Sequence, residues 1–175
     1  MRENVRLRDL NIAVPLGDDR EIEVLAFGLP CRAGAQLAID ITMRSSVSSS
    51  GHAHPRAPTE DSVIANAARS DKESTYPEFV GSGRCELVVL ALEVGGRFSA
   101  ETFAFIEELA YAKAREATPA VRKSARLAWQ RRWVRLLACT AARAWCHGTT
   151  APAQLLSMPG ADSPTPEVHE LPFRG

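Results

Sequence analysis

Two stretches near the N-terminus alternate apolar and polar residues with a period of two. They are residues 22–27 and 36–43, and the segment GLPCRAG between them contains glycine and proline. Such alternation on both sides of turn residues predicts two β-strands joined as a hairpin. The mixed, turn-rich residues 1–20 form a lead-in segment for which the pattern predicts no element.

A long polar stretch follows the predicted hairpin. Residues 45–60 are rich in serine and proline and show no period, which predicts a mobile loop. Apolar residues then recur at helical spacing over 61–76, and Pro77 ends this pattern. The continuous apolar run ELVVLAL at 86–92 predicts a buried central strand, which the pair Gly95-Gly96 terminates.

Two further helices complete the predicted domain. Ser99 is placed to cap a helix that runs to about residue 116, with Glu101 in its first turn, where a negative charge suits the helix dipole. Thr118 followed by Pro119 predicts the start of a last helix. This helix is expected to end at His147, just before a glycine.

The order of these elements predicts an α/β fold, in which a small mixed sheet is flanked by helices. A β-hairpin and one central strand make up the sheet, and the domain spans residues 21–148. The proline-rich residues 149–175 show no apolar period and are expected to form a disordered tail. A chain of 175 residues has the size of one ordinary domain.

Bulk composition narrows the class of protein. The chain is 45% hydrophobic and 24% charged, and its 21 basic residues balance its 21 acidic ones. Four widely spaced cysteines fit reduced thiols better than a disulfide framework. Without a signal-peptide core or an 18-residue apolar run, we expect a soluble intracellular protein, nuclear or cytoplasmic, with no membrane partner. No phosphate-binding glycine motif is present, and no small-molecule cofactor is expected.

Basic charge is concentrated in the last predicted helix. Between Pro119 and Gly148 there are seven basic residues and no acidic one. Helical spacing predicts a packing stripe made of Leu127, Val134, Ala138, Ala141 and Trp145. The opposite side carries four arginines: Arg131, Arg132, Arg135 and Arg143. This cationic face suits contacts with the phosphate backbone of DNA, or else it solubilises the helix by pairing with the acidic segment 60–116.

Two carboxylates in the predicted hairpin stand at positions expected to be buried. Glu23 shares a strand face with Leu25, and Asp40 shares one with Ala38. A buried carboxylate without a partner is costly, so each acid could pair with a flanking arginine, face water or cap a loop. If the two strands are adjacent, however, the acids lie close enough to hold one divalent cation between them. Magnesium needs only such oxygen ligands together with a phosphate and water.

Most of the chain resembles one known nuclease family. The order of elements and the segments LAIDITM, DKESTY, LVVLALEVGG, SAETFAFIEEL and RLAWQRRWVRLL carry the resemblance. They are similar to the restriction-like endonuclease domain at the C-terminus of site-specific non-LTR retrotransposon polyproteins, a member of the PD-(D/E)xK superfamily. The resemblance covers roughly residues 18–148 and implies a restriction-endonuclease-like fold.

The resemblance also implies which residues form the site. The first acid of the family, normally within Pro-Asp, falls at Glu23, and the second falls at Asp40. The displaced Lys-x-x-Lys-Tyr pattern falls on Lys72 and Tyr76, with threonine in place of its second lysine. The acid after the third strand falls at Glu93, either a peripheral ligand or a strand-end charge.

The activity implied is hydrolysis of DNA phosphodiester bonds with Mg²⁺ or Mn²⁺. Glu23 and Asp40 would hold the metal, which polarises the phosphate and lowers the pKa of bound water. Lys72 would orient that water or stabilise the transition state. The alternative is a non-catalytic relic that keeps the basic helix as a nucleic-acid or protein binding surface. Because no reverse transcriptase region precedes the domain, a fragment of a longer polyprotein is also expected.

Overall fold

The computed structural model describes residues 1–154, except residues 11, 49, 58, 61, 81, 82 and 84. For residues 147–154 it describes the backbone only. The chain forms one sheet from the strands β1 (Arg2–Arg6), β2 (Glu21–Ala26), β3 (Gln36–Arg44) and β4 (Cys85–Glu93). Their order in the sheet is β1-β2-β3-β4, with the first two pairings antiparallel and the third parallel. The predicted mixed sheet and α/β class are therefore confirmed. Strand β4 lies at the edge of the sheet, however, which corrects the central position predicted for residues 86–92.

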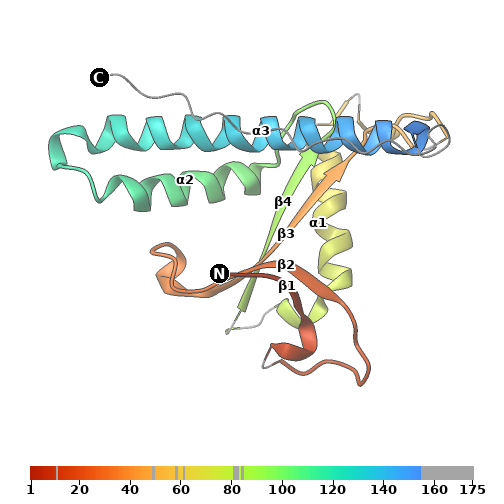
Figure 1. Cartoon of the computed structure of the whole chain (residues 1–175), viewed down its shortest axis with the longest axis horizontal. Helices are drawn as coiled ribbons and strands as arrows, with labels where there is room; N and C mark the ends of the chain where they lie inside the picture. The colour runs from red at the N-terminus through yellow and green to blue at the C-terminus, as the bar shows by residue number, and fades with distance from the viewer. Residues whose placement is uncertain are drawn as a thin grey trace, which may run out of the picture.

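Three helices accompany the sheet (Figure 1): α1 (Val63–Thr75), α2 (Ala100–Ala114) and α3 (Arg122–Gln154). Helix α1 makes the crossover between the parallel strands β3 and β4, the connection that a parallel pair requires. Helix α2 begins as predicted, because the Ser99 hydroxyl accepts a hydrogen bond from the backbone N–H of Thr102 at 3.0 Å. Helix α3 runs antiparallel to α2 and packs mainly against it (Figure 1).

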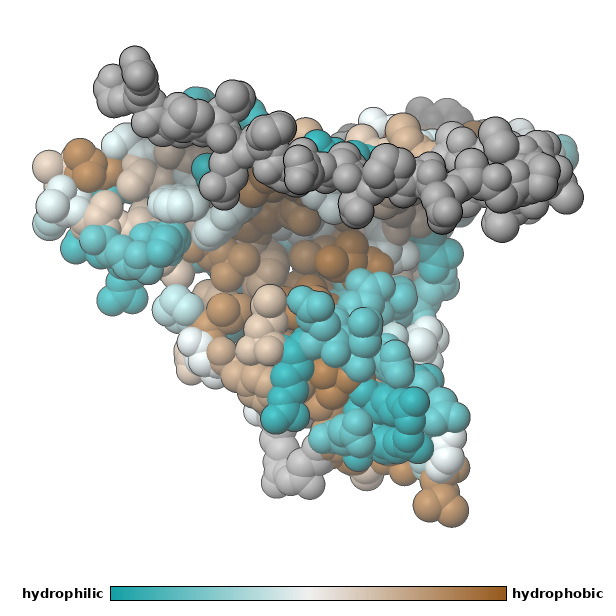
Figure 2. Space-filling view, viewed as in Figure 1, coloured by the Kyte–Doolittle hydropathy of each residue, from teal (hydrophilic) through white to brown (hydrophobic). Residues whose placement is uncertain are grey.

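The two faces of the sheet each bury an apolar cluster. On β4, Leu87 and Val89 pack toward α1 with Ala65 and Ala68, whereas the alternate residue Val88 packs toward Phe105 of α2. This alternation is the period-two geometry of a strand covered on both faces. It explains why the sequence of β4 is a continuous apolar run. Figure 2 shows apolar side chains gathered where the helix pair meets the sheet, and polar ones over β1.

The N-terminal lead-in belongs to the domain, which corrects the boundary expected at residue 21. Its first residues form the edge strand β1, which pairs with β2 in the register Val5 to Ile22 and Arg6 to Glu21. A short 3-10 helix at Leu7–Asp9 follows, and Leu7 is completely buried. Only one of the five β1 residues is buried, so the segment has no clear strand pattern to read from its sequence.

Residues 45–60 contain an irregular turn whose own backbone groups are partly paired. The N–H of Ser48 bonds to the carbonyl of His52 at 2.8 Å, and Val47 forms an isolated bridge with Ala53. No strand or helix forms among the described residues of this loop, as predicted, and its mobility stays a prediction.

The packing stripe of helix α3 matches the predicted one in part. Val134 and Ala141 are half-buried as predicted, whereas Leu127 and Trp145 are 45% and 44% exposed. Trp129, Trp133 and Leu137, which were not in the predicted stripe, are half-buried as well. The difference arises because α3 packs mainly against α2 and needs a narrow contact face, so some apolar residues remain outside it. The helix also continues past the expected end at His147 to Gln154, and the rest of the predicted disordered tail lies outside the described residues.

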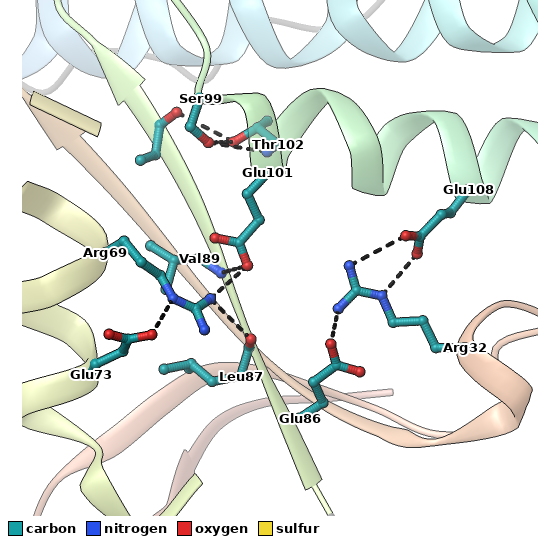
Figure 3. A network of polar contacts seen from close by, with 11 residues as sticks. Arg32, Arg69, Glu73, Glu86, Leu87, Val89, Ser99, Glu101, Thr102 and Glu108 are labelled. Carbon is teal, nitrogen blue, oxygen red and sulfur yellow. Dashed lines mark hydrogen bonds and ion pairs between the residues drawn. The ribbon is translucent and has the colours of Figure 1, made fainter. Parts of the chain in front are cut away.

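The open edge of β4 is closed by side chains from both layers (Figure 3). Glu101 of α2 accepts a hydrogen bond from the N–H of Val89 at 3.2 Å, and Arg69 of α1 donates one to the carbonyl of Leu87 at 3.1 Å. Further along this strand, Glu86 forms an ion pair with Arg32, which also bonds to Glu108 of α2 at 2.8 Å. An edge strand whose backbone groups are already bonded is a poor template for another chain.

No helix in the described part of the chain is both long enough and apolar enough to cross a membrane.

Candidate active site at a fork between two strands

Strands β2 and β3 separate at the position of the predicted acids. Their paired residues end with Val24 opposite Ile39, although β3 continues its pairing with β4 as far as Arg44. Extending the register by one residue would set Glu23 opposite Asp40. We call this opening, between residues 21–23 of β2 and 40–44 of β3, the strand fork. The expected adjacency of the two acid-bearing strands is thus confirmed, but their ladder ends beside the acids.

Asp40 lies at the bottom of the strand fork and is only 1% exposed. Its Oδ1 lies 2.6 Å from the Nζ of Lys72, and its Oδ2 lies 3.1 Å from the hydroxyl of Tyr76. Both partners come from the C-terminal end of α1, where a spacing of four residues puts them on the same side of the helix. A buried carboxylate is stable here because an ammonium group is its partner.

The Tyr76 hydroxyl bridges the two sides of the strand fork. Besides approaching Asp40, it donates a hydrogen bond to the backbone carbonyl of Glu21 at 2.8 Å. A phenol has one proton, whereas the carbonyl and an ionised carboxylate both only accept, so this one proton serves two acceptors. Burial and the charge of Asp40 raise the pKa of Tyr76, which therefore keeps its proton at neutral pH.

Glu23 stands at the mouth of the strand fork and is exposed, which corrects the expectation that it is buried. Its Oε2 accepts a hydrogen bond from the backbone N–H of Ile41 at 3.0 Å, in place of the missing ladder bond. Desolvation raises the pKa of the Glu23 carboxyl and the charge of Asp40 raises it further, while the Ile41 N–H and Lys72 oppose this rise. The N–H that Glu23 binds belongs to the residue that follows Asp40 on β3, so both acids lie at the strand fork.

A backbone irregularity on β1 accompanies the strand fork. Asn4 has φ of +49°, a left-handed value that asparagine tolerates better than most residues, and the paired positions of β1 and β2 pass over Asn4 and Glu23. On β2, both Ile22 and Leu25 pack into the apolar cluster on the face that α1 covers. Residues three apart on a regular strand would point to opposite faces. The strand therefore turns about its axis at Glu23, which lets the side chain reach β3.

An ion-pair network fixes the end of α1 that carries Lys72 and Tyr76. Arg20 binds Asp18 and Glu78, and it donates a hydrogen bond to the carbonyl of Thr75 in the last turn of α1. Asp18 is buried, and its hydrogen bonds from Arg20 lower its pKa. Arg20 thus neutralises two acids and occupies a free carbonyl at the helix terminus. This group is not predictable from the sequence, because nothing in the spacing of Arg20 and Glu78 links them.

The structure does not bring Glu93 into the strand fork. Asp40 pairs with Val89, so Glu93 lies four residues farther along β4, at a distance of roughly 13 Å at the usual rise of a strand. Its carboxylate instead lies 3.9 Å from Arg97 and lines a hollow beside Val63, at the N-terminal end of α1. Of the five predicted catalytic residues, four converge and Glu93 does not, so its role as a strand-end charge fits the structure better.

The predicted nucleic-acid-binding arginines remain on the outer side of α3. Arg131, Arg132, Arg135 and Arg143 are all exposed, and they form no ion pair with any described residue. Arg132 also contacts the ring of Trp129, at 5.9 Å from the ring centre. None of the four pairs with a described residue of the acidic segment 60–116, whereas Arg126 of the same helix pairs with Glu107. Because α3 packs on α2, this surface and the strand fork belong to opposite faces of the sheet.

The strand fork offers two carboxylates to a divalent cation. Glu23 and Asp40 supply two carboxylates against the single ammonium group of Lys72, which leaves one negative charge in excess. Two carboxylates form a small donor set, and no group of three or more acidic, cysteine or histidine side chains gathers within the described residues. Magnesium sites that also bind substrate phosphate often use only one or two carboxylates.

Comparisons with known proteins found no relative of this chain. No protein-family model matches the chain, and neither a curated protein nor a solved structure matches it.

Proposed function

We propose that this chain is a metal-dependent endonuclease-like domain, derived from a retrotransposon polyprotein, that hydrolyses phosphodiester bonds in DNA. The observation that carries the proposal is the convergence of Glu23, Asp40, Lys72 and Tyr76 at the strand fork. The mixed sheet, with a hairpin beside the parallel pair β3–β4 and helices on both faces, is compatible with a restriction-endonuclease-like fold.

Each residue of the strand fork has a separate task in this proposal. Glu23 and Asp40 would hold Mg²⁺ or Mn²⁺, which supplies charge stabilisation and an activated water when bound. Lys72 provides a mobile cation for the negative charge that develops on a phosphate. Tyr76 holds Asp40 in place through its hydroxyl and is a positioning residue. Glu23 faces solvent, so a substrate phosphate has access from that side.

Cleavage of supercoiled plasmid in Mg²⁺ or Mn²⁺ tests the proposal. We expect nicking by the wild-type chain, its abolition by EDTA, and a loss of at least about 100-fold in Asp40→Ala, the size typical of removing a charge-stabilising group. The matched control is Asp71→Ala on the same helix as Lys72, since Asp71 is exposed and pairs with Arg44. Absence of nicking in both metals, or equal nicking by Asp40→Ala, would overturn the proposal.

A second candidate function is DNA binding without cleavage. Four exposed arginines on α3 have no acidic partner in the described chain, so their charge is available for phosphates. This surface lies on the opposite face of the sheet from the strand fork and does not need an intact site. Salt-sensitive binding that survives Asp40→Ala, together with no nicking, would favour this candidate.

A further inference from the structure

The two oxygens of the Asp40 carboxylate are bound very differently. Oδ2 has the Tyr76 hydroxyl, whereas Oδ1 has no hydrogen-bond partner in the described chain and faces only the Lys72 ammonium at 2.6 Å. Oδ1 is therefore the one ligand atom at the strand fork whose sole partner is a charged side chain on a flexible stem. The side chain of Lys72 is 21% exposed, so solvent lies within its reach.

A divalent cation and the ammonium group cannot both take this position. Magnesium binds a carboxylate oxygen at about 2.0–2.1 Å, which would place the ion in the space that the ammonium group fills. Two cations held by one oxygen would also repel each other inside a poorly solvated site. Lys72 must therefore leave Oδ1 before a metal can bind there.

We infer that Lys72 and the divalent cation are alternative partners of Asp40 Oδ1, so that Lys72 closes the metal site in the free protein. This inference rests on the proposed function in assuming that Asp40 binds metal. Part of the binding free energy of the metal is then used to displace Lys72. The observed affinity equals the intrinsic affinity multiplied by the fraction of molecules in which Lys72 has left Oδ1. Displacement also frees the ammonium group to turn toward the exposed side, where a substrate phosphate would approach.

Direct measurement of Mn²⁺ binding tests the inference without any cleavage assay. By calorimetry or by the electron paramagnetic resonance of free Mn²⁺, Lys72→Met should bind Mn²⁺ about 10- to 100-fold more tightly than wild type. Lys72→Arg keeps a cation at the position and should show no gain. Arg44→Met removes one positive charge from β3 without touching Asp40, so it should change affinity less than about threefold.

A second measurement uses the wild-type chain and does not depend on whether Lys72→Met folds. Acylation of individual lysines, read by peptide mass spectrometry, should show Lys72 reacting several-fold faster when Mn²⁺ is added. Lys113 of α2, which pairs with Glu116 just beyond the helix, should react at an unchanged rate. Metal binding without any change at Lys72 would overturn the inference.

The outcomes separate this inference from the proposed function. Equal or weaker Mn²⁺ binding by Lys72→Met, with Mn²⁺ bound by wild type, overturns the inference and leaves the nuclease proposal standing. Tighter binding by Lys72→Met with no nicking by wild type supports the inference and overturns the nuclease proposal. If neither protein binds Mn²⁺, both are overturned.

Discussion

Arg69 of α1 and Glu101 of α2 form an ion pair at 2.6 Å around the open edge of β4, although their helices cover opposite faces of the sheet. Each partner also bonds to the strand, Glu101 to the N–H of Val89 and Arg69 to the carbonyl of Leu87 (Figure 3). Glu73 completes the pairing of Arg69 at 2.9 Å. The pair therefore joins three layers and blocks the sheet edge at once.

We expect Arg69→Ala and Glu101→Ala each to lower the free energy of unfolding by about 1–3 kcal/mol, because each leaves a backbone group of β4 and a charge without a partner. The double variant should lose less than the sum, with a coupling energy of about 0.5–3 kcal/mol. Denaturant unfolding of the four proteins measures this cycle. The exposed pair Lys113 and Glu116 is the control and should couple by less than about 1 kcal/mol. Additive losses at Arg69 and Glu101 would contradict the interpretation.

Tyr76→Phe should destabilise the fold by about 1–2 kcal/mol, because removal of the hydroxyl leaves the Glu21 carbonyl and Asp40 Oδ2 with no donor. Tyr111→Phe is the matched control, since Tyr111 is exposed and contacts Arg126 through its ring. We expect that variant to unfold like wild type. Chemical denaturation measures both, and an effect of equal size in the two variants would show that the bridge at the strand fork contributes nothing.

Glu23→Gln should stabilise the chain at pH 7 and lose this advantage in acid. The pKa of Glu23 is raised in the folded chain, so its contribution to stability is fully present below the unfolded pKa and is lost as pH rises through the folded pKa. Glutamine mimics the protonated form and still offers an oxygen to the Ile41 N–H. Unfolding free energies between pH 3.5 and 7.5 measure the difference.

The control for that experiment is Glu3→Gln on the neighbouring strand β1, which removes the same charge but no bond to Ile41. The gain of Glu23→Gln over Glu3→Gln at pH 7 isolates the local environment of the strand fork. A Glu23→Gln variant that is less stable than wild type at pH 7 would show that the carboxylate is favoured there as an anion.

Changing Arg131, Arg132 and Arg135 together to Gln should weaken DNA binding and flatten its salt dependence. Each lost phosphate contact reduces the slope of log K against log salt by about 0.9. The double change Arg122→Gln with Lys123→Gln, near the start of the same helix, tests whether the position or only the total charge matters. Fluorescence anisotropy at several salt concentrations measures both, and an unchanged slope in the triple variant would mean that these arginines contact no DNA.

Much of the fold could be predicted because its pattern is local. The period of β2 and β3, the apolar run of β4, the Ser99 cap and Pro77 after α1 each fix an element through neighbours in sequence. Edge strand β1 was not predicted, because an edge strand with one buried residue carries almost no alternation. The packing stripe of α3 was predicted only in part because both faces of that helix carry apolar residues, and only the partner helix selects between them.

The candidate site was predictable in its residues and not in its geometry. Glu23 and Asp40 could be singled out as acids within a predicted hairpin, whereas Lys72 and Tyr76 were indicated only by the family resemblance; the structure has both beside Asp40. The exposure of Glu23 depends on where β2 separates from β3, and the alternation of apolar and polar residues does not indicate that point. The network of Arg20 also joins residues far apart in the chain.

The parallel pairing of β3 with β4 sets the order in which this molecule can assemble. Residues of the β2–β3 hairpin are close in sequence and can meet early, whereas Asp40 lies opposite Val89 across a crossover of 49 positions. Such non-local contacts close slowly, because the entropy of the intervening chain must be lost first. We expect the Asp40 carboxylate to stay hydrated during early folding and to lose its water when α1 and β4 dock, since its partners Lys72 and Tyr76 lie at the end of α1. Docking of β4 is expected to be the slow step, and its kinetics should be sensitive to substitutions at position 40.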